Sequence, residues 1–201
     1  NLANITTKMK IKTYDKFWTM SLSKKISSKH GKFDVIYSAN TIRHIHNLEE
    51  TFKAIENLLT THGVFILEDP SLLKSLQKVS YDQFYDEHAY VFSITALKNL
   101  NEKTGLKIFD IEELKTHGGS NRVYFKKIDN KKIKISKIVN MHLSKERKFG
   151  INKLITYKTF AKKVKKSKKN LVKIFQKLKK KKNKIIGYGA TYKSSTVLNF
   201  C

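Results

Sequence analysis

The chain has 201 residues, 40% of them hydrophobic, which is enough for one substantial core or for one domain and part of another. Its formal net charge of +26 raises nucleic acid or an anionic membrane surface as a partner. Only three of its 42 basic residues are Arg (Arg43, Arg122 and Arg147). Proteins that read bases and phosphates favour the bidentate Arg side chain, so this Lys excess argues against nucleic acid.

Cysteine usage and hydropathy indicate a reducing compartment. The only cysteine is Cys201, so no internal disulfide forms. No signal peptide and no apolar run of membrane-spanning length occurs, and we expect a cytoplasmic protein with no membrane partner. Because the chain starts at Asn1 without Met and stops inside a predicted helix, we also expect a fragment with both ends missing.

The first half of the chain predicts a strand–helix–strand unit. The elements expected in order are a helix end over 2–9, a strand over 11–14, a helix over 18–29, a buried strand over 33–39, a helix from 48 ended by His62-Gly63, and a strand over 64–67. Leu48, Phe52 and Ile55 share one helical face. Short connections of this kind build a parallel sheet covered by helices, an α/β fold.

The second half begins with strands and becomes helical. We expect a helix over 94–103, strands over 106–114 and 121–128, helices over 134–148 and 151–182, and then strand, Gly turn and helix start over 183–201. The two consecutive strands have no helix between them and therefore predict an antiparallel pair at the sheet edge. Lys179–Lys182 is interpreted as a solvated helix end.

A cluster of polar and aromatic residues, YDQFYDEHAYVFS (Tyr81–Ser93), follows the second predicted strand. His88 is the natural acid or base in it, because the ordinary pKa of histidine lies near neutrality. Tyr85 and Glu87 are candidates to tune His88 or to hold a substrate hydroxyl. The chemistry alone leaves open a surface turn whose polar groups satisfy one another.

Three further segments carry candidate site residues. SANTIRHIH (Ser38–His46) follows a strand, where α/β sheets bind ligands, although His44 alone is also compatible with a structural histidine. THGGSNR (Thr116–Arg122) offers close backbone approach and a phosphate partner, or simply a tight hairpin turn. GYGATYKSS (Gly187–Ser195) offers an anion site at a helix start, with Lys193 adding charge. No histidine pair has helical metal-ligand spacing, so we expect no metal in this chain.

In combination and in this order, these motifs resemble the S-adenosylmethionine-dependent sugar C-methyltransferases, which act on nucleotide-linked keto-deoxysugars. The resemblance covers nearly the whole chain. It implies a partial doubly wound class I methyltransferase sheet over 1–130, a helical connection over 131–182 and the start of a C-terminal α/β domain over 183–201. It also implies that the N-terminal zinc domain and the first part of the methyltransferase domain are missing. Zinc is therefore expected only in that missing domain, and we expect the chain alone to be inactive.

The resemblance implies C-methylation beside a ketone, in which a base forms an enolate that attacks the sulfonium methyl group. The base is the histidine of the YDEH motif, here His88, and Tyr85, Glu87 and His44 match positions beside the substrate. These roles agree with the chemistry of the residue types.

The resemblance also assigns binding residues. The cofactor residues expected are Phe17, Trp18, Ala39 and Asn40. The substrate-side residues expected are His117, Gly118, Gly119, Ser120, Asn121 and Arg122, and the physics of the Gly turn adds Lys193 for the nucleotide phosphates. One departure concerns the residue before the aromatic pair, which is acidic in related sequences and is Lys16 here. The alternative function is a Lys-rich nucleic-acid-binding module, whose affinity would fall steeply with salt.

Overall fold

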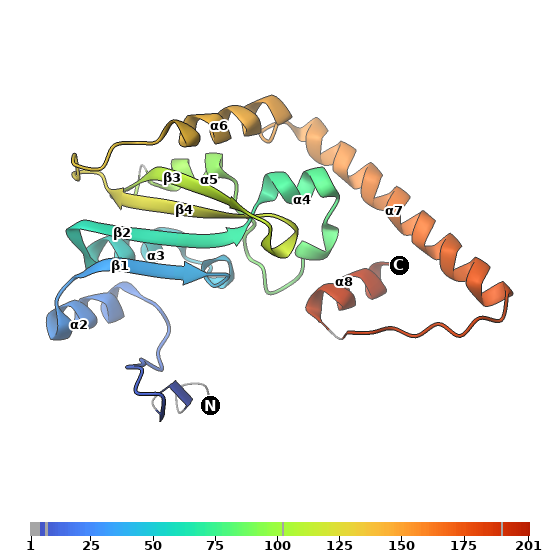
Figure 1. Ribbon diagram of the computed structural model, residues 1–201, viewed down its shortest axis with the longest axis horizontal. Helices are drawn as coiled ribbons and strands as arrows, with labels where there is room; N and C mark the ends of the chain where they lie inside the picture. The colour runs from blue at the N-terminus through green and yellow to red at the C-terminus, as the bar shows by residue number, and fades with distance from the viewer. Residues whose placement is uncertain (1–4, 7, 102, 190) are drawn as a thin grey trace.

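A four-stranded sheet forms the centre of the computed structural model, which describes residues 5–6, 8–101, 103–189 and 191–201 (Figure 1). The strands are β1 (Phe33–Ala39), β2 (Leu59–Pro70), β3 (Leu106–Leu114) and β4 (Ser120–Lys127). The helices are α2 (Met20–His30), α3 (Leu48–Leu58), α4 (Leu72–Lys78), α5 (Ile94–Asn101), α6 (Lys137–Phe149), α7 (Leu154–Lys180) and α8 (Tyr192–Phe200). Short 3₁₀ turns are η1 (Ile42–His44), η2 (Tyr81–Gln83) and η3 (Thr116–Gly118).

The strand order is β1-β2-β4-β3. β1 and β2 are parallel, whereas β4 runs antiparallel to both β2 and β3. The α/β class, the parallel pair and the antiparallel edge pair are therefore confirmed. Because β1 and β2 point the same way, their carboxyl ends meet at one edge of the sheet, and this edge positions the site described below.

The core lies between the sheet and the helices α3 and α5, which lie behind it in Figure 1. Phe52 of α3, Phe65 of β2 and Phe125 of β4 have no exposed surface, and their ring centroids lie 5.2 to 5.7 Å apart. Burying each of these rings contributes roughly 2–3 kcal/mol. Val139 of α6 packs against the same cluster and joins the second half of the chain to the sheet.

Four predicted elements differ from the structure. Residues 11–14 pair with no strand in the described part of the chain. β1 is mostly exposed rather than buried, because it is the edge strand: Val35 is 60% and Tyr37 56% exposed. α3 ends at Leu58 instead of His62-Gly63, since the β-branched Thr60 and Thr61 continue into β2. No strand forms over 183–189, which is an exposed segment without sheet partners.

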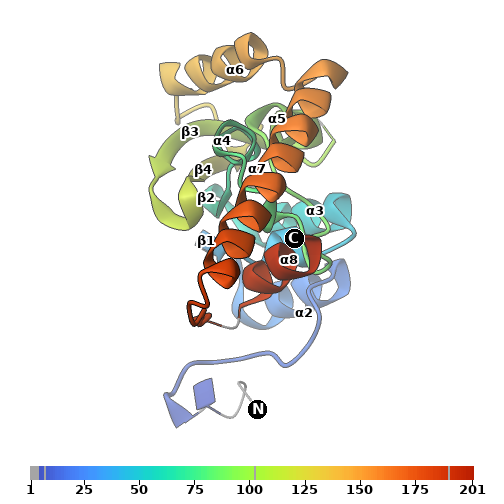
Figure 2. The same ribbon diagram turned by 90° about the vertical axis from the view of Figure 1, so that its right-hand side faces the viewer.

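The C-terminal helices return to the carboxyl edge of the sheet. Figure 1 shows α7 leaving the end of α6 and passing beyond that edge, and Figure 2, in which that side faces the viewer, shows α7 and α8 in front of the strands. The ring of Phe200 packs on Tyr81 with centroids 5.6 Å apart, and the Lys168 ammonium group lies 4.6 Å from the Phe200 centroid. α8 is thereby fixed between α7 and the loop that follows α4. None of the helices in the described ranges is long and apolar enough to cross a membrane.

Candidate active site

Three connections meet at the carboxyl edge of β1 and β2. They are the turn after β1 that includes η1, the loop between α4 and α5 (residues 79–93, the acid–base loop), and the turn between β3 and β4. The loop is tied to the first turn by backbone, since Tyr90 N donates to the Arg43 carbonyl at 3.2 Å. It is tied to the third by the Gln83 side chain, which donates to the His117 carbonyl at 3.4 Å. Residues distant in sequence are therefore held together as one site.

His88 lies half-buried in the acid–base loop with a fixed tautomer. Its Nδ1 lies 2.7 Å from the Gln83 carbonyl oxygen, which can only accept, so Nδ1 carries the proton. In the neutral ring Nε2 then carries the lone pair, and Nε2 is buried without a hydrogen-bond partner. Burial lowers the pKa of His88, and the charges of Arg43, His44 and Lys193 lower it further. The hydrogen bond to the Gln83 carbonyl raises the pKa and offsets part of this shift. The lowered pKa favours the neutral form of the His88 imidazole at physiological pH.

His44 and Tyr85 flank the His88 ring. The His44 ring meets the His88 ring edge-on, with ring centroids 5.0 Å apart, and its Nδ1–H donates to the Glu87 carbonyl at 2.8 Å. The Tyr85 ring lies 3.8 Å from it. Burial raises the pKa of Tyr85, so its hydroxyl remains a proton donor at neutral pH. Glu87 contacts His44 through its backbone, and its exposed carboxylate acts on Tyr85 only through charge.

Sequence reasoning missed a buried ion pair beneath this cluster. Arg43 Nε lies 3.4 Å from Asp69 Oδ1, and the two side chains are 8% and 4% exposed. Arg43 also donates to Asn40 Oδ1 at 3.1 Å. Burial raises the pKa of Asp69 to about 7, although the Arg43 charge opposes the shift. The available sequence signal was a charged residue close to the end of each predicted strand, Arg43 in TIRHI and Asp69 in LEDP.

The predicted substrate-side segment between β3 and β4 divides into two parts. His117 and Gly118 are exposed, and His117 adopts a left-handed φ of 51°. The pKa of His117 is lowered by desolvation and by the charges of Lys193 and Arg43, so this histidine faces the same cluster. The remaining members, Gly119, Ser120 and Asn121, are buried.

Arg122 lies on the other side of the sheet edge in an ion-pair network. Its Nε and one terminal nitrogen donate to Glu68 Oε2 at 3.1 and 3.0 Å, and the other terminal nitrogen donates to Glu112 at 2.9 Å. The phosphate-binding role predicted for Arg122 therefore competes with two carboxylates. Gly119 has a φ of 134°, and a Cβ there would lie 2.9 Å from Lys74 Cγ, so glycine is required by both conformation and space.

The start of α8 covers the acid–base loop. Tyr192 stacks on Tyr85 with ring centroids 5.9 Å apart and 10° between planes, so Tyr85 lies between Tyr192 and His88. Lys193 is close enough to lower the pKa values of both His88 and His117. Sequence reasoning singled out Lys193 but not Tyr192, whose aromatic type carried no motif signal.

Two of the residues expected to bind the cofactor, Ala39 and Asn40, lie at this edge. Ala39 ends β1, and Asn40 follows it with a left-handed φ of 53°, its N–H donating to the Glu68 carbonyl at 2.8 Å. The Phe17 ring is 94% exposed and free to stack on a planar ligand. Trp18 instead packs against the core and donates Nε1 to the Thr51 carbonyl at 3.3 Å. Phe17, Ala39 and Asn40 therefore stay predicted cofactor residues, whereas Trp18 is held against the core by its packing and its hydrogen bond.

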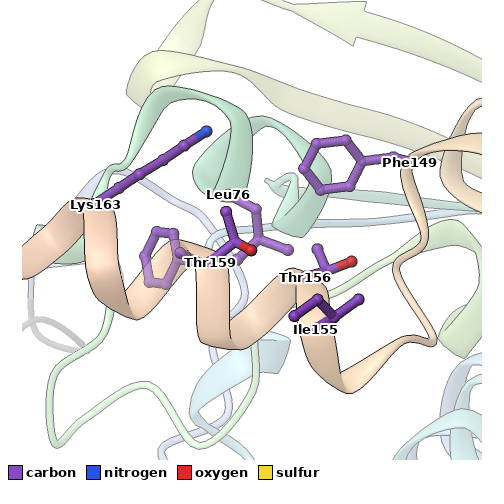
Figure 3. Close-up of a pocket in the computed structure, with 7 residues that line it drawn as sticks. Leu76, Phe149, Ile155, Thr156, Thr159 and Lys163 are labelled. Carbon is purple, nitrogen blue, oxygen red and sulfur yellow. The ribbon is translucent and has the colours of Figure 1, made fainter.

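No group of three or more His, Cys, Asp or Glu side chains that suits a metal ion occurs among the described residues. A pocket of about 240 Å³ lies between α4 and α7, lined chiefly by Leu76, Phe149 and Phe160 with Lys163 at its rim (Figure 3). It offers no acid–base pair. The ring centroids of Phe160 in this pocket and Phe84 in the acid–base loop lie 5.8 Å apart, so the pocket lining also supports that loop.

Comparison with known proteins assigns the two halves of the chain. The family described as "Methyltransferase domain" matches residues 6–111, and the family described as "C-methyltransferase C-terminal domain" matches residues 115–201. The chain is 27% identical over its 201 residues to C-methyltransferase NovU from Streptomyces niveus. It covers 48% of that protein, so it spans about half the length of this curated relative.

Two solved structures are similar at lower identity. A S-adenosylmethionine-dependent methyltransferase from Clostridium acetobutylicum is 18% identical, with a TM-score of 0.43 over 61% of this chain and 68% of the other. A SAM-dependent methyltransferase from Anabaena variabilis is 14% identical, with a TM-score of 0.42 over 54% of this chain and 55% of the other.

Proposed function

Since the chain belongs to the methyltransferase-domain family, we propose that the protein carrying it transfers a methyl group from S-adenosylmethionine to a carbon beside the ketone of a nucleotide-linked keto-deoxysugar. The match of residues 115–201 to the C-methyltransferase C-terminal domain and the likeness to NovU support carbon as the acceptor atom. The nucleic-acid-binding alternative gains no support, because both matched families are methyltransferase families.

His88 is the proposed base. A carbon acid beside a ketone needs a neutral base near pH 7, within reach of the proton and shielded from water. Nε2 of His88 has its lone pair free and buried, while the Nδ1–H bond to the Gln83 carbonyl fixes the ring. This arrangement is the single observation that carries the proposal.

The neighbours of His88 suit the charge that develops in the reaction. As His88 takes the proton, negative charge moves to the ketone oxygen, and hydrogen-bond donors or cations aimed at that oxygen lower the barrier. The Tyr85 hydroxyl keeps its proton, and Lys193 adds a positive charge on the same side. His44, with its ring edge on His88, stands beside the substrate position, and Glu87 orients His44 through its carbonyl.

The cofactor supplies an electrophilic methyl group on its sulfonium sulfur. Phe17, Ala39 and Asn40 are the residues of this chain proposed to bind it, with the strand-end backbone of Ala39 and Asn40 next to His44 and the acid–base loop. The substrate-side turn, residues 117–122, is proposed to orient the sugar. The start of α8 lies against the acid–base loop through the contact of Tyr192 with Tyr85, and it is proposed to limit the access of water to the enolate.

The test uses the complete protein that carries this chain, with S-adenosylmethionine labelled in the methyl group and a nucleotide-linked keto-deoxysugar. We expect labelled methyl to appear on carbon. His88→Asn should lower the rate by about 10²–10⁴-fold, because a positioned base contributes that much, while cofactor binding measured by calorimetry is kept. Wild-type turnover in His88→Asn would remove His88 as the base, and label on oxygen or nitrogen would overturn C-methylation.

A further inference from the structure

Buried polar atoms without hydrogen-bond partners gather at the carboxyl edge of the sheet. Buried polar groups are normally hydrogen-bonded, so a cluster of them without hydrogen bonds indicates that these residues serve a function besides stabilising the fold. Eight such side-chain atoms occur in the described part of the chain, and six of them belong to this edge. They are Arg43 Nε, both Asp69 carboxylate oxygens, Gln83 Oε1, His88 Nε2 and Asn121 Oδ1. Two of them, Arg43 Nε and Asp69 Oδ1, face each other as an ion pair at 3.4 Å without a hydrogen bond.

Arg43 lies at the centre of this cluster. It is 7% exposed and shares a small buried space with Asp69 and Gln83. Its guanidinium spans two strand ends, because one nitrogen donates to Asn40, just after β1, while another faces Asp69, near the end of β2. Its backbone carbonyl accepts from Tyr90 in the acid–base loop. One residue therefore connects the cofactor side, the sheet and the loop that carries the base.

We propose that Arg43, anchored by Asp69, is a positioning residue for the methyl transfer: it locks the left-handed turn that carries Asn40 and places a fixed positive charge beside the loop that carries His88. A guanidinium suits both tasks. Its planar fork bridges two acceptors at once, and it stays charged at every physiological pH, whereas a lysine ammonium does neither as well.

The fixed charge has a defined consequence for the base. The groups that face His88 are Arg43 and His44 of the first turn, Tyr85 of its own loop and Lys193 of α8. Arg43 and Lys193 disfavour the imidazolium form, which lowers the pKa of His88 and keeps Nε2 able to accept a proton. Arg43 in turn faces Asp69 and Tyr85, and Asp69 also faces Glu68.

This role rests on the proposed function, but its test does not require catalysis. The protonation of His88 is followed by NMR in the isotope-labelled 201-residue chain. Removing Arg43 alone would leave the buried Asp69 without its partner and change its protonation, so the variant is Arg43→Met with Asp69→Asn, which removes both titratable partners and roughly keeps the volume. We expect the His88 titration midpoint to move upward. The control Arg147→Gln removes an exposed arginine of α6 and should leave that midpoint unchanged.

Arg43→Lys separates the two tasks. It keeps the charge but cannot bridge Asn40 and Asp69 with a fork, so the backbone amide resonance of Asn40 should move while the His88 midpoint stays at its wild-type value. A folded double variant with the wild-type His88 midpoint would overturn the electrostatic role, and an unmoved Asn40 amide in Arg43→Lys would overturn the positioning role. Absence of methyl transfer by the complete protein would sink the proposed function while leaving these NMR results standing, which keeps the two failures distinct.

Discussion

The carboxylate of Glu146 joins the second half of the chain to the first, and removing it should be costly. Glu146 lies on α6 and is 1% exposed. Its Oε1 accepts from Ile94 N at 2.7 Å, and its Oε2 accepts from Thr95 N at 2.8 Å and from the Thr95 hydroxyl at 2.6 Å. Ser93 Oγ accepts from Ala96 N at 3.0 Å, so the first N–H groups of α5 are all capped.

The size of the effect follows from these contacts. Loss of a helix cap costs roughly 0.5–2 kcal/mol, and leaving the buried Ile94 N–H unpaired adds roughly 1–3 kcal/mol. Glu146→Ala should therefore lower the free energy of unfolding by about 3 kcal/mol, a large share of the 5–15 kcal/mol that is typical of a domain. Glu146→Gln keeps an acceptor but loses the charge and should cost roughly half as much.

Urea unfolding followed by circular dichroism measures this difference. The control is Glu49→Ala, which removes an exposed pair with Lys53 on α3 and should leave the free energy of unfolding almost unchanged. A Glu146→Ala midpoint equal to that of Glu49→Ala, at an unchanged denaturant slope, would show that the capping contacts do not connect α6 to α5 in solution.

Three further predictions concern pH, backbone and cofactor. Lys74 and Lys145 lower the pKa of Glu113 to about 2. Its stabilising effect is therefore complete above the ordinary glutamate pKa and is lost as the pH falls through about 2. In urea at pH 7, Glu113→Gln should lower the free energy of unfolding by about 1 kcal/mol, a value already reduced for the partial exposure of the side chain. Near pH 2 the same substitution should change the free energy of unfolding almost not at all. Gly119→Ala should lower the free energy of unfolding by roughly 1–3 kcal/mol, because φ is 134° and the new Cβ meets Lys74. The control Gly187→Ala places its Cβ in open space and should leave the free energy of unfolding unchanged in the same assay. The 201-residue chain alone should bind S-adenosylmethionine weakly or not at all, since the residues proposed to bind it, Phe17, Ala39 and Asn40, would contact only one side of it. Low-micromolar binding by calorimetry would contradict this.

Local patterns predicted the elements wherever the pattern and the packing agreed. β3 was predicted with the bounds that the structure gives, because Gly105 and the turn over 116–118 limit a run in which Leu106, Ile108 and Ile111 face the core. The strand expected over 11–14 has the right residue types, but no neighbouring strand is available to pair with it. The end of α3 was misplaced because Gly63 looks like a helix stop, whereas it lies inside β2, where a Cβ would meet the Phe33 carbonyl at 2.8 Å.

The candidate site was predictable only where residues carry a motif. His88, Tyr85 and His44 were singled out by residue type and position, and the structure places their rings in contact. Arg43 and Asp69 were not, because their pairing depends on the parallel alignment of β1 and β2 and leaves no local spacing to detect. Tyr192 was missed for a similar reason, since its contact with Tyr85 depends on where the chain after α7 positions α8.

Proton exchange at the substrate carbon tests the central claim, His88 as the base, most directly. The complete protein is incubated in D₂O with the keto-deoxysugar nucleotide and a non-transferring analogue of the cofactor, and deuterium beside the ketone is followed by NMR. We predict exchange in the wild type and its loss by about 10²-fold or more in His88→Asn, with cofactor binding kept. Exchange at the wild-type rate in His88→Asn would contradict the account and move the base to another residue of the loop.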